Sequence, residues 1–342
     1  MTTLRVGART SPLARTQADW VAARIEARGV PCEFVGVVTT GDVDQRALTQ
    51  IGGTGLFVGA VRSGLVRRTI DVAVHSLKDL PTGAEPGLRI AAMPEREDVR
   101  DVLVGSTLDA LGDGARVGTG SPRRAVQLQA WAHRQGIDLQ VVPVRGNVDT
   151  RIGHVGSGAL DATVLAAAGL RRLGRLVAEG PDGRCRVVSA GEGGTPEDGV
   201  VAQLVPTDVL LPAAGQGALA VEVAEDNELP ELSAVDALDD PATRARVTAE
   251  RTFLARLEAG CLAPVGVLAS LHASPPSGTG DSQAQDLTLD AVIGRTIGSD
   301  VAHPAVPELL QVSLTGAVSQ ARQLGTELAE QALSRLGHDL RR

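Results

Sequence analysis

Strand-like and helix-like segments alternate along this chain from its first residues to beyond residue 170. An apolar segment at 4–7 precedes a helix-like segment at 12–28, and a second strand-like segment follows at 33–38. Such alternation is typical of α/β proteins, in which helices cover the faces of a mostly parallel sheet. We therefore predict an α/β fold for most of the chain.

The length of 342 residues exceeds what one ordinary core accommodates, so two or three domains are expected. A charged stretch at 93–101 predicts a crossover into a second lobe, and an apolar segment at 209–223 predicts a return to the first. Two crossovers make a hinged cleft. The last third differs in character and predicts a smaller α+β domain. The predicted domains are 1–96 with 217–236, 97–216, and 237–342.

Composition limits the classes of partner. The net charge is −8, and the aromatic residues are two Trp, three Phe and no Tyr, so a basic or base-stacking nucleic-acid surface is not expected. The cysteines Cys32, Cys185 and Cys261 are too far apart for a disulfide framework or a CxxC metal site. No apolar run reaches the roughly 18 residues that span a bilayer. We predict a soluble cytoplasmic protein without a metal.

The octapeptide at 74–81, Val-His-Ser-Leu-Lys-Asp-Leu-Pro, places Lys78 and Asp79 at the end of a strand predicted at 69–74. Ligands of open α/β sheets bind beyond the carboxyl ends of the strands, so the pair is a candidate for chemistry. Incidental charges on a solvated loop remain an equal alternative for this peptide alone.

Two helix starts carry the same Ser-Pro pair, at Ser11 and Ser121. Serine is a good N-cap and proline a good first helical residue, so both ends should present backbone N–H groups to carboxylates or phosphates. Arginines that match carboxylates accompany these and two further strand ends, although any one of them alone is more often a surface side chain. They are Arg9, Arg15, Arg123, Arg124, Arg145, Arg151, Arg171 and Arg172. The predicted ligand carries several carboxylates.

These motifs resemble, in order and spacing, those of the porphobilinogen deaminase family. The resemblance covers residues 5–267 and rests on GARTSPLARTQ, GGTGLF, DVAVHSLKDLPT, GTGSPRRAVQL, VRGNVDTR, PAAGQGAL and EAGCLAPVG. It implies two lobes like those of a periplasmic solute-binding protein and a cofactor-bearing third domain. It further implies a hydroxymethylbilane synthase, a transferase that joins four porphobilinogen units head to tail and releases ammonia at each step.

The family's dipyrromethane cofactor is held by a thioether, and the matching residue here is Cys261. Gly260 is predicted to end the preceding helix in a left-handed turn, which would expose the thiol beyond it. Considered alone, Cys261 would more often be a small buried hydrophobe.

The resemblance assigns Asp79 as the catalytic carboxylate. Loss of ammonia from the aminomethyl group leaves an azafulvene cation, and an ionised Asp held against the pyrrole N–H stabilises that charge. Lys78 would hold a carboxylate and help keep Asp79 ionised, and Ser76 would bond within the same turn.

The resemblance implies two further sets of residues, since each pyrrole ring carries an acetate and a propionate. Those predicted to contact the cofactor are Ser76, Lys78, Thr119, Ser121, Arg123, Arg124, Arg145, Gln216 and the attachment residue Cys261. Those predicted to contact the substrate are Arg9, Ser11, Gln17, Phe57, Arg151 and Arg172. Phe57 would cover a pyrrole ring when a glycine-rich lid at 39–55 closes, with core packing as an equal alternative.

Two other functions are compatible with the same residues. A non-catalytic carboxylate-binding protein would share the two-lobe plan, because fold does not fix function. A nucleic-acid-binding domain would use the arginine clusters and would show steep salt dependence. The expected partner of the enzyme is porphobilinogen, and the expected form is a monomer without nucleic acid or membrane.

Overall fold

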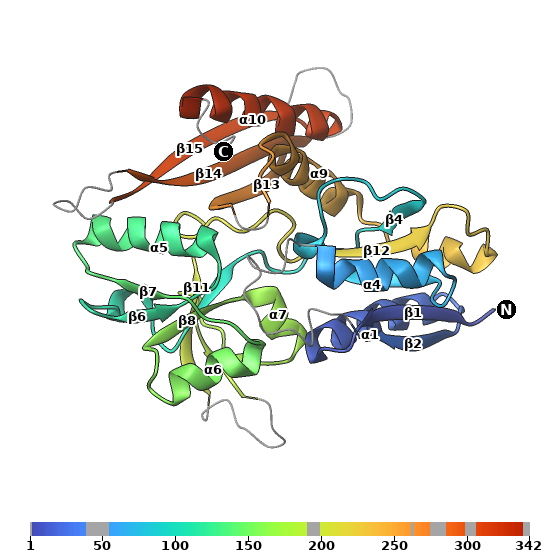
Figure 1. Cartoon of the computed structure of the whole chain (residues 1–342), viewed down its shortest axis with the longest axis horizontal. Helices are drawn as coiled ribbons and strands as arrows, with labels where there is room; N and C mark the ends of the chain where they lie inside the picture. Colours follow the sequence, from blue (N-terminus) through green and yellow to red (C-terminus); the bar gives the residue numbers. More distant parts are fainter. Residues whose placement is uncertain are drawn as a thin grey trace.

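The computed structural model of the chain describes residues 2–38, 55–189, 199–260, 263–273, 285–297 and 306–337. These residues form three sheets, each with its own helices (Figure 1). In the view of Figure 1 the two larger sheets lie side by side below the third. None of the helices in the described ranges is long and apolar enough to cross a membrane.

The first sheet has the strand order β2-β1-β3-β12-β4. Its strands are β1 (Leu4–Arg9), β2 (Cys32–Val37), β3 (Val72–Ser76), β4 (Leu88–Ala92) and β12 (Leu219–Ala224). β1 is parallel to β2 and β3, whereas β12 is antiparallel to β3 and β4. The chain therefore returns to its first sheet after residue 218, as the sequence predicted.

Helices α1 (Pro12–Glu26) and α4 (Gly55–Val66) pack on this first sheet. Val21 and Ile25 of α1 are fully buried against Leu4 and Val6 of β1. The short α8 (Ser233–Asp236) lies beside β4. Apolar residues on one face of α1 and on the central strands thus build this core.

The second sheet has the order β7-β6-β8-β5-β11-β10-β9. Its strands are β5 (Asp101–Val104), β6 (Arg116–Gly118), β7 (Gln140–Val142), β8 (Ala162–Ala166), β9 (Leu176–Val177), β10 (Arg184–Val187) and β11 (Val200–Val205). Its helices are α5 (Pro122–Gln135), α6 (Val148–Gly156) and α7 (Ala167–Arg172). β6 is parallel to β7 and β8, whereas β5 is antiparallel to β8 and β11, and β10 is antiparallel to β11 and β9.

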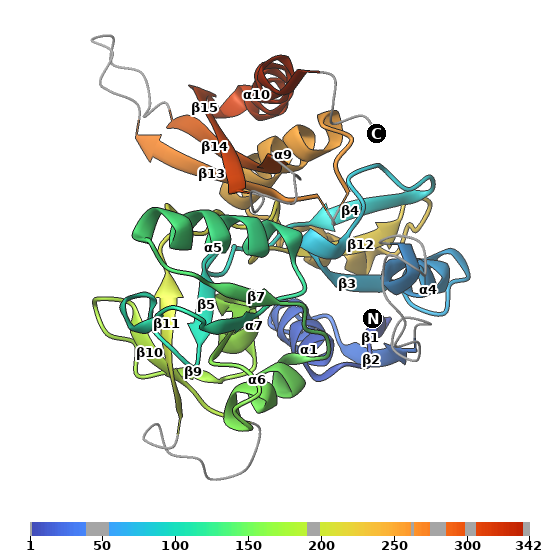
Figure 2. The same cartoon turned by 60° about the vertical axis from the view of Figure 1, so that its left-hand side comes forward.

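The third sheet has three antiparallel strands in chain order, covered by two helices (Figure 2). The strands are β13 (Val265–Ala273), β14 (Gln285–Ile297) and β15 (Val306–Ala317), and the helices are α9 (Pro241–Arg256) and α10 (Ala321–Leu336). α9 and α10 approach closely at Gly325, where an added Cβ would lie 2.5 Å from the carbonyl oxygen of Ala249. This smaller α+β part confirms the fold predicted for the last third.

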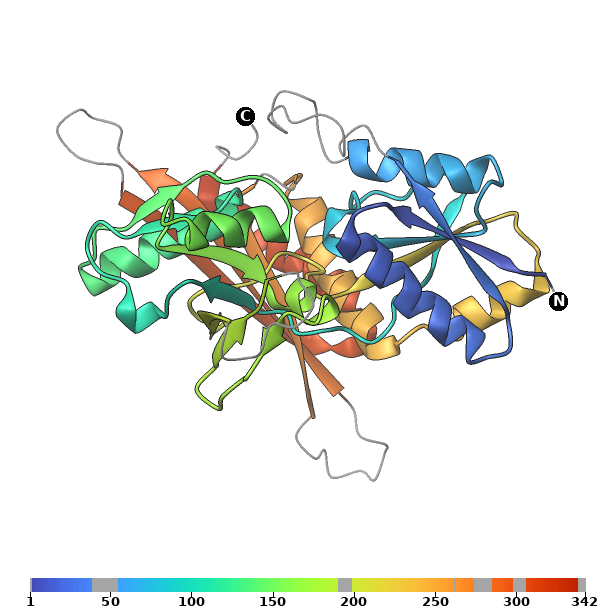
Figure 3. The ribbon, with the colours of Figure 1, turned by 90° about the horizontal axis from the view of Figure 1, so that it is seen from below.

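The chain crosses between the two larger sheets twice, at 93–100 and at 206–218 (Figure 3). The two crossing segments touch where Glu97 N–H donates to the Gly217 carbonyl at 3.2 Å. Gly217 has a φ of 87°, and a Cβ there would meet the Glu97 carbonyl oxygen at 2.4 Å. Only glycine fits this contact between the crossings.

Several predicted element boundaries differ from the structure. The strand predicted at 69–74 lies at 72–76, because the chain first turns through Arg68 at a φ of 59°. The lid predicted at 39–55 falls outside the described residues except for Gly55, which begins α4. The predicted domain boundaries stay a prediction.

The end of α9 also differs from the prediction. The left-handed residue is Glu258, with a φ of 55°, and not Gly260. Glu258 N–H donates to the Ala255 carbonyl at 3.0 Å, and Ala259 N–H donates to the Leu254 carbonyl at 3.2 Å. This pair of bonds is a Schellman motif, which satisfies the last carbonyls of the helix but usually has glycine at the left-handed position.

We predict that Glu258→Gly stabilises the protein by about 1 kcal/mol, because glycine removes the Cβ clash of the left-handed conformation. Urea unfolding measures the effect. Glu258→Ala is the matched control, since it removes the carboxylate but keeps the Cβ. Equal unfolding midpoints for the two variants would contradict the explanation.

Candidate functional site

The turn that carries Lys78 and Asp79 follows directly on the central strand β3. It is a single 3-10 turn, Leu77–Asp79, anchored by the fully buried Leu77. The Leu77 N–H donates to the Ala218 carbonyl at 3.0 Å, and the Leu80 N–H donates to the Leu77 carbonyl at 3.1 Å. Lys78 is half-buried and Asp79 is exposed. The buried leucine and the two bonds present both charged side chains beyond the strand end.

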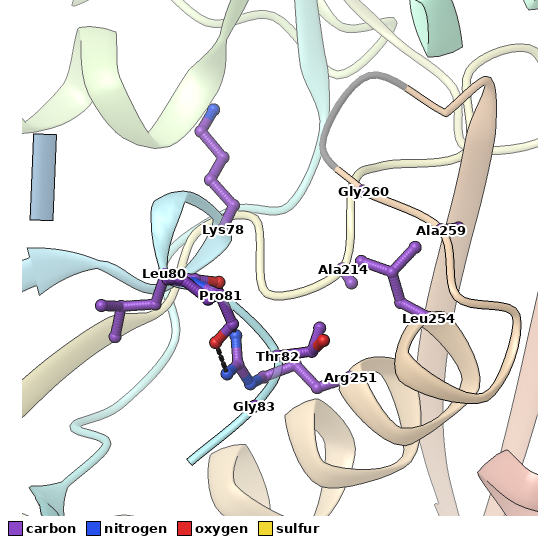
Figure 4. Close-up of a pocket in the computed structure, with 10 residues that line it drawn as sticks. All are labelled: Lys78, Leu80, Pro81, Thr82, Gly83, Ala214, Arg251, Leu254, Ala259 and Gly260. Atoms are coloured by element: carbon purple, nitrogen blue, oxygen red, sulfur yellow. Dashed lines mark hydrogen bonds between the residues drawn. The ribbon is translucent and has the colours of Figure 1, made fainter. Parts of the chain in front are cut away.

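Lys78 connects this turn electrostatically to the second lobe. Its amine extends away from Arg251 and Pro81 (Figure 4). Burial lowers the pKa of Lys78 to about 8; Asp79 and Asp101 oppose the shift, while Arg124 and Arg123 add to it. Because Asp101, Arg123 and Arg124 belong to the second sheet and its helix α5, the structure brings the two predicted clusters together.

The predicted helix start at Ser121 is confirmed in position but not in its capping bond. Ser121 is the N-cap of α5 with Pro122 first in the helix, yet its side chain accepts no capping hydrogen bond. Its own N–H donates to Oγ1 of the buried Thr119 at 3.2 Å. At the other start, Ser11 Oγ caps α1 by accepting from Ala14 N–H at 3.4 Å.

The predicted binding residues Arg123 and Arg124 both contact a buried protein carboxylate. Arg123 Nη2 lies 2.9 Å from Oδ2 of Asp101, and Arg124 Nη2 lies 2.7 Å from Oδ1. Each guanidinium also donates to a backbone carbonyl, of Leu211 at 2.6 Å and of Val164 at 3.0 Å. Burial would raise the pKa of Asp101, but the two arginines outweigh it and hold the pKa far below its usual range.

The cluster around Asp101 holds two arginines against one carboxylate, which leaves an excess positive charge at the start of α5. Nε of Arg124 is buried and has no hydrogen-bond partner among the described residues. A buried donor without a partner is rare in native proteins, so this Nε is available to an acceptor from a ligand or a water molecule. Gln216, predicted to contact the cofactor, donates from Nε2 to Asp101 at 2.9 Å and to the Val99 carbonyl at 2.7 Å.

Three further predicted arginines lie in different surroundings. Arg145 is exposed, and Arg151 is half-buried with its Nε donating to the Gly146 carbonyl at 3.0 Å. Burial lowers the pKa of Arg151, and Arg124 and Arg145 lower it further, so these three cations form one region. Arg172 Nη2 donates to the Gly217 carbonyl at 2.7 Å, and burial lowers its pKa to about 10. Arg172 thus binds the backbone of the second crossing segment, 206–218.

The first lobe contributes polar residues from β1, α1 and the end of β3. Gln17 Nε2 lies 3.0 Å from Ser76 Oγ, which ties α1 to the strand end before Lys78. Gln17 is buried, and Ser11 and Arg9 are half-buried nearby in sequence. Ser76 therefore bonds to the helix and not within its own turn.

Two of the predicted site residues have no described side chain. Cys261 lies outside the described residues, and Phe57 lies in α4 without a described side chain. Gly260, which precedes Cys261, lines a pocket of about 160 Å³ between the end of α9 and the turn after β3 (Figure 4). Lys78 and Arg251 also line it. The last described residue before the predicted attachment site thus faces the same pocket as Lys78.

Sequence reasoning missed the carboxylates that organise this region, Asp101 and Glu250, and the arginines Arg96 and Arg251. The charged stretch at 93–101 contains two of the four, but its pattern predicts only a crossover. Arg96 forms a bidentate ion pair with the fully buried Glu250 at 2.7 and 2.9 Å. The partners are 154 residues apart, so no local pattern indicated the pair.

The chain matches two models of a known protein family. A family model described as "Porphobilinogen deaminase, dipyromethane cofactor binding domain" matches residues 4–231, and one described as "Porphobilinogen deaminase, C-terminal domain" matches residues 244–334. "Porphobilinogen deaminase 1" of Streptomyces coelicolor is 48% identical over 97% of this chain and 95% of its own length. "Porphobilinogen deaminase" of Cutibacterium acnes is 41% identical over 97% and 95%.

Two solved structures share part of this chain's fold at low sequence identity. A periplasmic substrate-binding protein of an ABC transporter from Coxiella burnetii is 12% identical, with a TM-score of 0.38 over 73% of this chain and 97% of its own. The methionine-binding protein MetQ is 11% identical, with a TM-score of 0.38 over 69% and 89%.

We predict that Asp101→Asn destabilises the protein by about 3–5 kcal/mol, because it leaves two buried guanidinium groups without a counter-charge. Urea unfolding measures the loss. Asp19→Asn is the control, since Asp19 is exposed and its ion pair with Arg15 should contribute less than about 1 kcal/mol. A loss at Asp101 as small as that at Asp19 would show that the buried cluster contributes little.

Proposed function

Because the chain belongs to the porphobilinogen deaminase family and is a hydroxymethylbilane synthase with a dipyrromethane cofactor, we propose that its chemistry takes place between the Lys78–Asp79 turn and the start of α5. One observation carries the proposal. The second crossing segment joins the two parts, since Gln216 Nε2 donates to Asp101 at 2.9 Å and the Ala218 carbonyl accepts from Leu77 N–H at 3.0 Å; the charges of Asp79, Arg123, Arg124 and Asp101 all act on the pKa of Lys78. A single ligand lying there would meet both lobes.

The dipyrromethane group supplies, when bound, the primer to which porphobilinogen units are joined. The residues at the site fit such a polyanion, since each of its rings carries an acetate and a propionate. Arg123 and Arg124 together exceed the charge of Asp101, and the buried Nε of Arg124 lacks a partner among the described residues. Thr119, Ser121, Arg145 and Gln216 complete the proposed cofactor contacts.

Asp79 is the proposed catalytic residue. Its exposed position beyond the strand end lets a pyrrole N–H approach the carboxylate directly. A carboxylate placed against the pyrrole N–H would stabilise the positive charge that develops when the substrate loses ammonia. Lys78, with a pKa of about 8, is mostly protonated at neutral pH and can hold a ligand carboxylate beside it.

The substrate contacts are proposed on both lobes. Arg9, Ser11 and Gln17 lie on β1 and α1, and Arg151 and Arg172 lie on α6 and α7. Phe57 belongs to the same proposal through its place at the start of α4. Cys261 is the proposed attachment residue, supported by the neighbouring Gly260 in the pocket that Lys78 lines.

We also propose a cytoplasmic monomer built of the three predicted domains. The free thiols of Cys32 and Cys185 support a reducing compartment. Burial raises the pKa of both thiols to about 11, so neither competes with Cys261 as a nucleophile.

Intact-protein mass tests the function and the attachment residue together. We expect the purified protein to exceed its sequence mass by two pyrrole units and Cys261→Ser to lack that excess, because the thioether needs the sulfur. Cys185→Ser is the matched control and should keep the added mass. An unmodified active protein would contradict the proposal, as would a Cys261→Ser variant that keeps the adduct.

We expect Asp79→Asn to lower kcat by at least about 100-fold while leaving the fold intact, because the exposed side chain contributes charge and little packing. Asp79→Glu, which keeps the charge on a longer arm, should retain part of the activity. Product formation and circular dichroism measure the two effects. Normal turnover by Asp79→Asn would remove Asp79 from the mechanism.

A further inference from the structure

Arg251 of α9 reaches across to the turn that carries Lys78 and Asp79. Its Nη2 donates to the Pro81 carbonyl at 2.6 Å (Figure 4). Its Nη1 donates to the Leu80 carbonyl at 3.1 Å and to the Leu77 carbonyl at 3.4 Å. One guanidinium thus binds three carbonyls of a five-residue segment, a contact that the rigid fork of arginine suits and a lysine amine does not.

These bonds tie the turn to α9, in addition to the bond that ties it to its own sheet. On the strand side, the Leu77 N–H is bonded to the Ala218 carbonyl at the entry to β12. On the helix side, the three carbonyls meet a charged donor, and such bonds are about twice as strong as neutral ones. The turn bearing Asp79 is therefore clamped between its own sheet and a helix of the third.

α9 is itself firmly placed by the residue next to Arg251. Glu250 is fully buried and accepts bonds from Arg96 at 2.7 and 2.9 Å, from Gly215 N–H at 2.7 Å and from Ala269 N–H at 2.9 Å. The helix then continues to Arg256 and leads toward Cys261. The clamp on the turn is thus fixed to the crossing segments and to the third sheet.

We propose that Arg251 is a positioning residue for the condensation reaction. It sets the place of the Asp79 turn relative to the helix that precedes the cofactor cysteine, and it acts through backbone carbonyls without touching the reacting atoms. This inference rests on the proposed function of Asp79 and Cys261. It differs from a simple charge effect, in which any cation lining the pocket would suffice.

The test compares Arg251→Lys with Arg251→Gln. Lysine keeps the charge but not the fork, so under the proposal both variants lose about 10- to 100-fold in kcat with little change in KM. Both should keep the added mass on Cys261. Hydrogen exchange of the Leu77 and Leu80 amides should quicken about tenfold or more, while exchange in β12 stays as in the parent protein.

Arg256→Gln is the matched control. Arg256 lies on the same helix but pairs with the exposed Glu330 at 3.3 Å, so kcat and exchange in the turn should not change. Full activity of Arg251→Lys would overturn the proposal in favour of charge alone. Faster exchange throughout β12 and α9 in both variants would overturn it in favour of general stability.

Asp79→Asn, measured in parallel, separates the two proposals. An inactive Asp79→Asn beside fully active Arg251 variants would leave the proposed function standing and remove the positioning role. An active Asp79→Asn would remove the function on which the positioning role depends.

Discussion

The buried carboxylate of Glu250 is the contact on which the arrangement of the three sheets depends. It accepts two bonds from Arg96 in the first crossing segment, one from Gly215 in the second and one from Ala269 in β13. A buried carboxylate is tolerated only when its oxygens are satisfied, and here they are satisfied by segments from three parts of the chain. Misplacing any one segment would leave a buried charge unpaired, so this residue specifies the assembly as well as stabilising it.

The same segments continue into the site. Arg96 Nε donates to the Gln216 carbonyl at 2.9 Å, and the Gln216 side chain reaches Asp101, which also binds Arg123 and Arg124. The acidic residues of this chain are therefore used partly inside, as counter-charges that fix arginines. The net charge of −8 is therefore compatible with a local excess of positive charge at Asp101, where two arginines share one carboxylate.

Local patterns in the sequence predict those features that residues close together in the chain determine, such as strands, helices and helix caps. Strand and helix alternation, the Ser11 cap and the return to the first sheet were all readable, because periodicity and capping act over a few residues. Pairings such as Arg96 with Glu250 were not, since they are decided by the packed fold. The left-handed Glu258 was also not predicted, because the preference for glycine at that position favours Gly260.

The arginine cluster shows why a family motif identifies residues without giving their contacts. The motif marks Arg123 and Arg124 as ligand-binding, whereas the structure shows each already bonded to Asp101 and to a backbone carbonyl. The two roles are compatible. A guanidinium held by buried partners has already lost its rotamer freedom, so under the proposed function a ligand carboxylate would bind it without that entropic cost. Asp101 thus prepares the cations, and their excess charge is what a growing chain of carboxylates would neutralise.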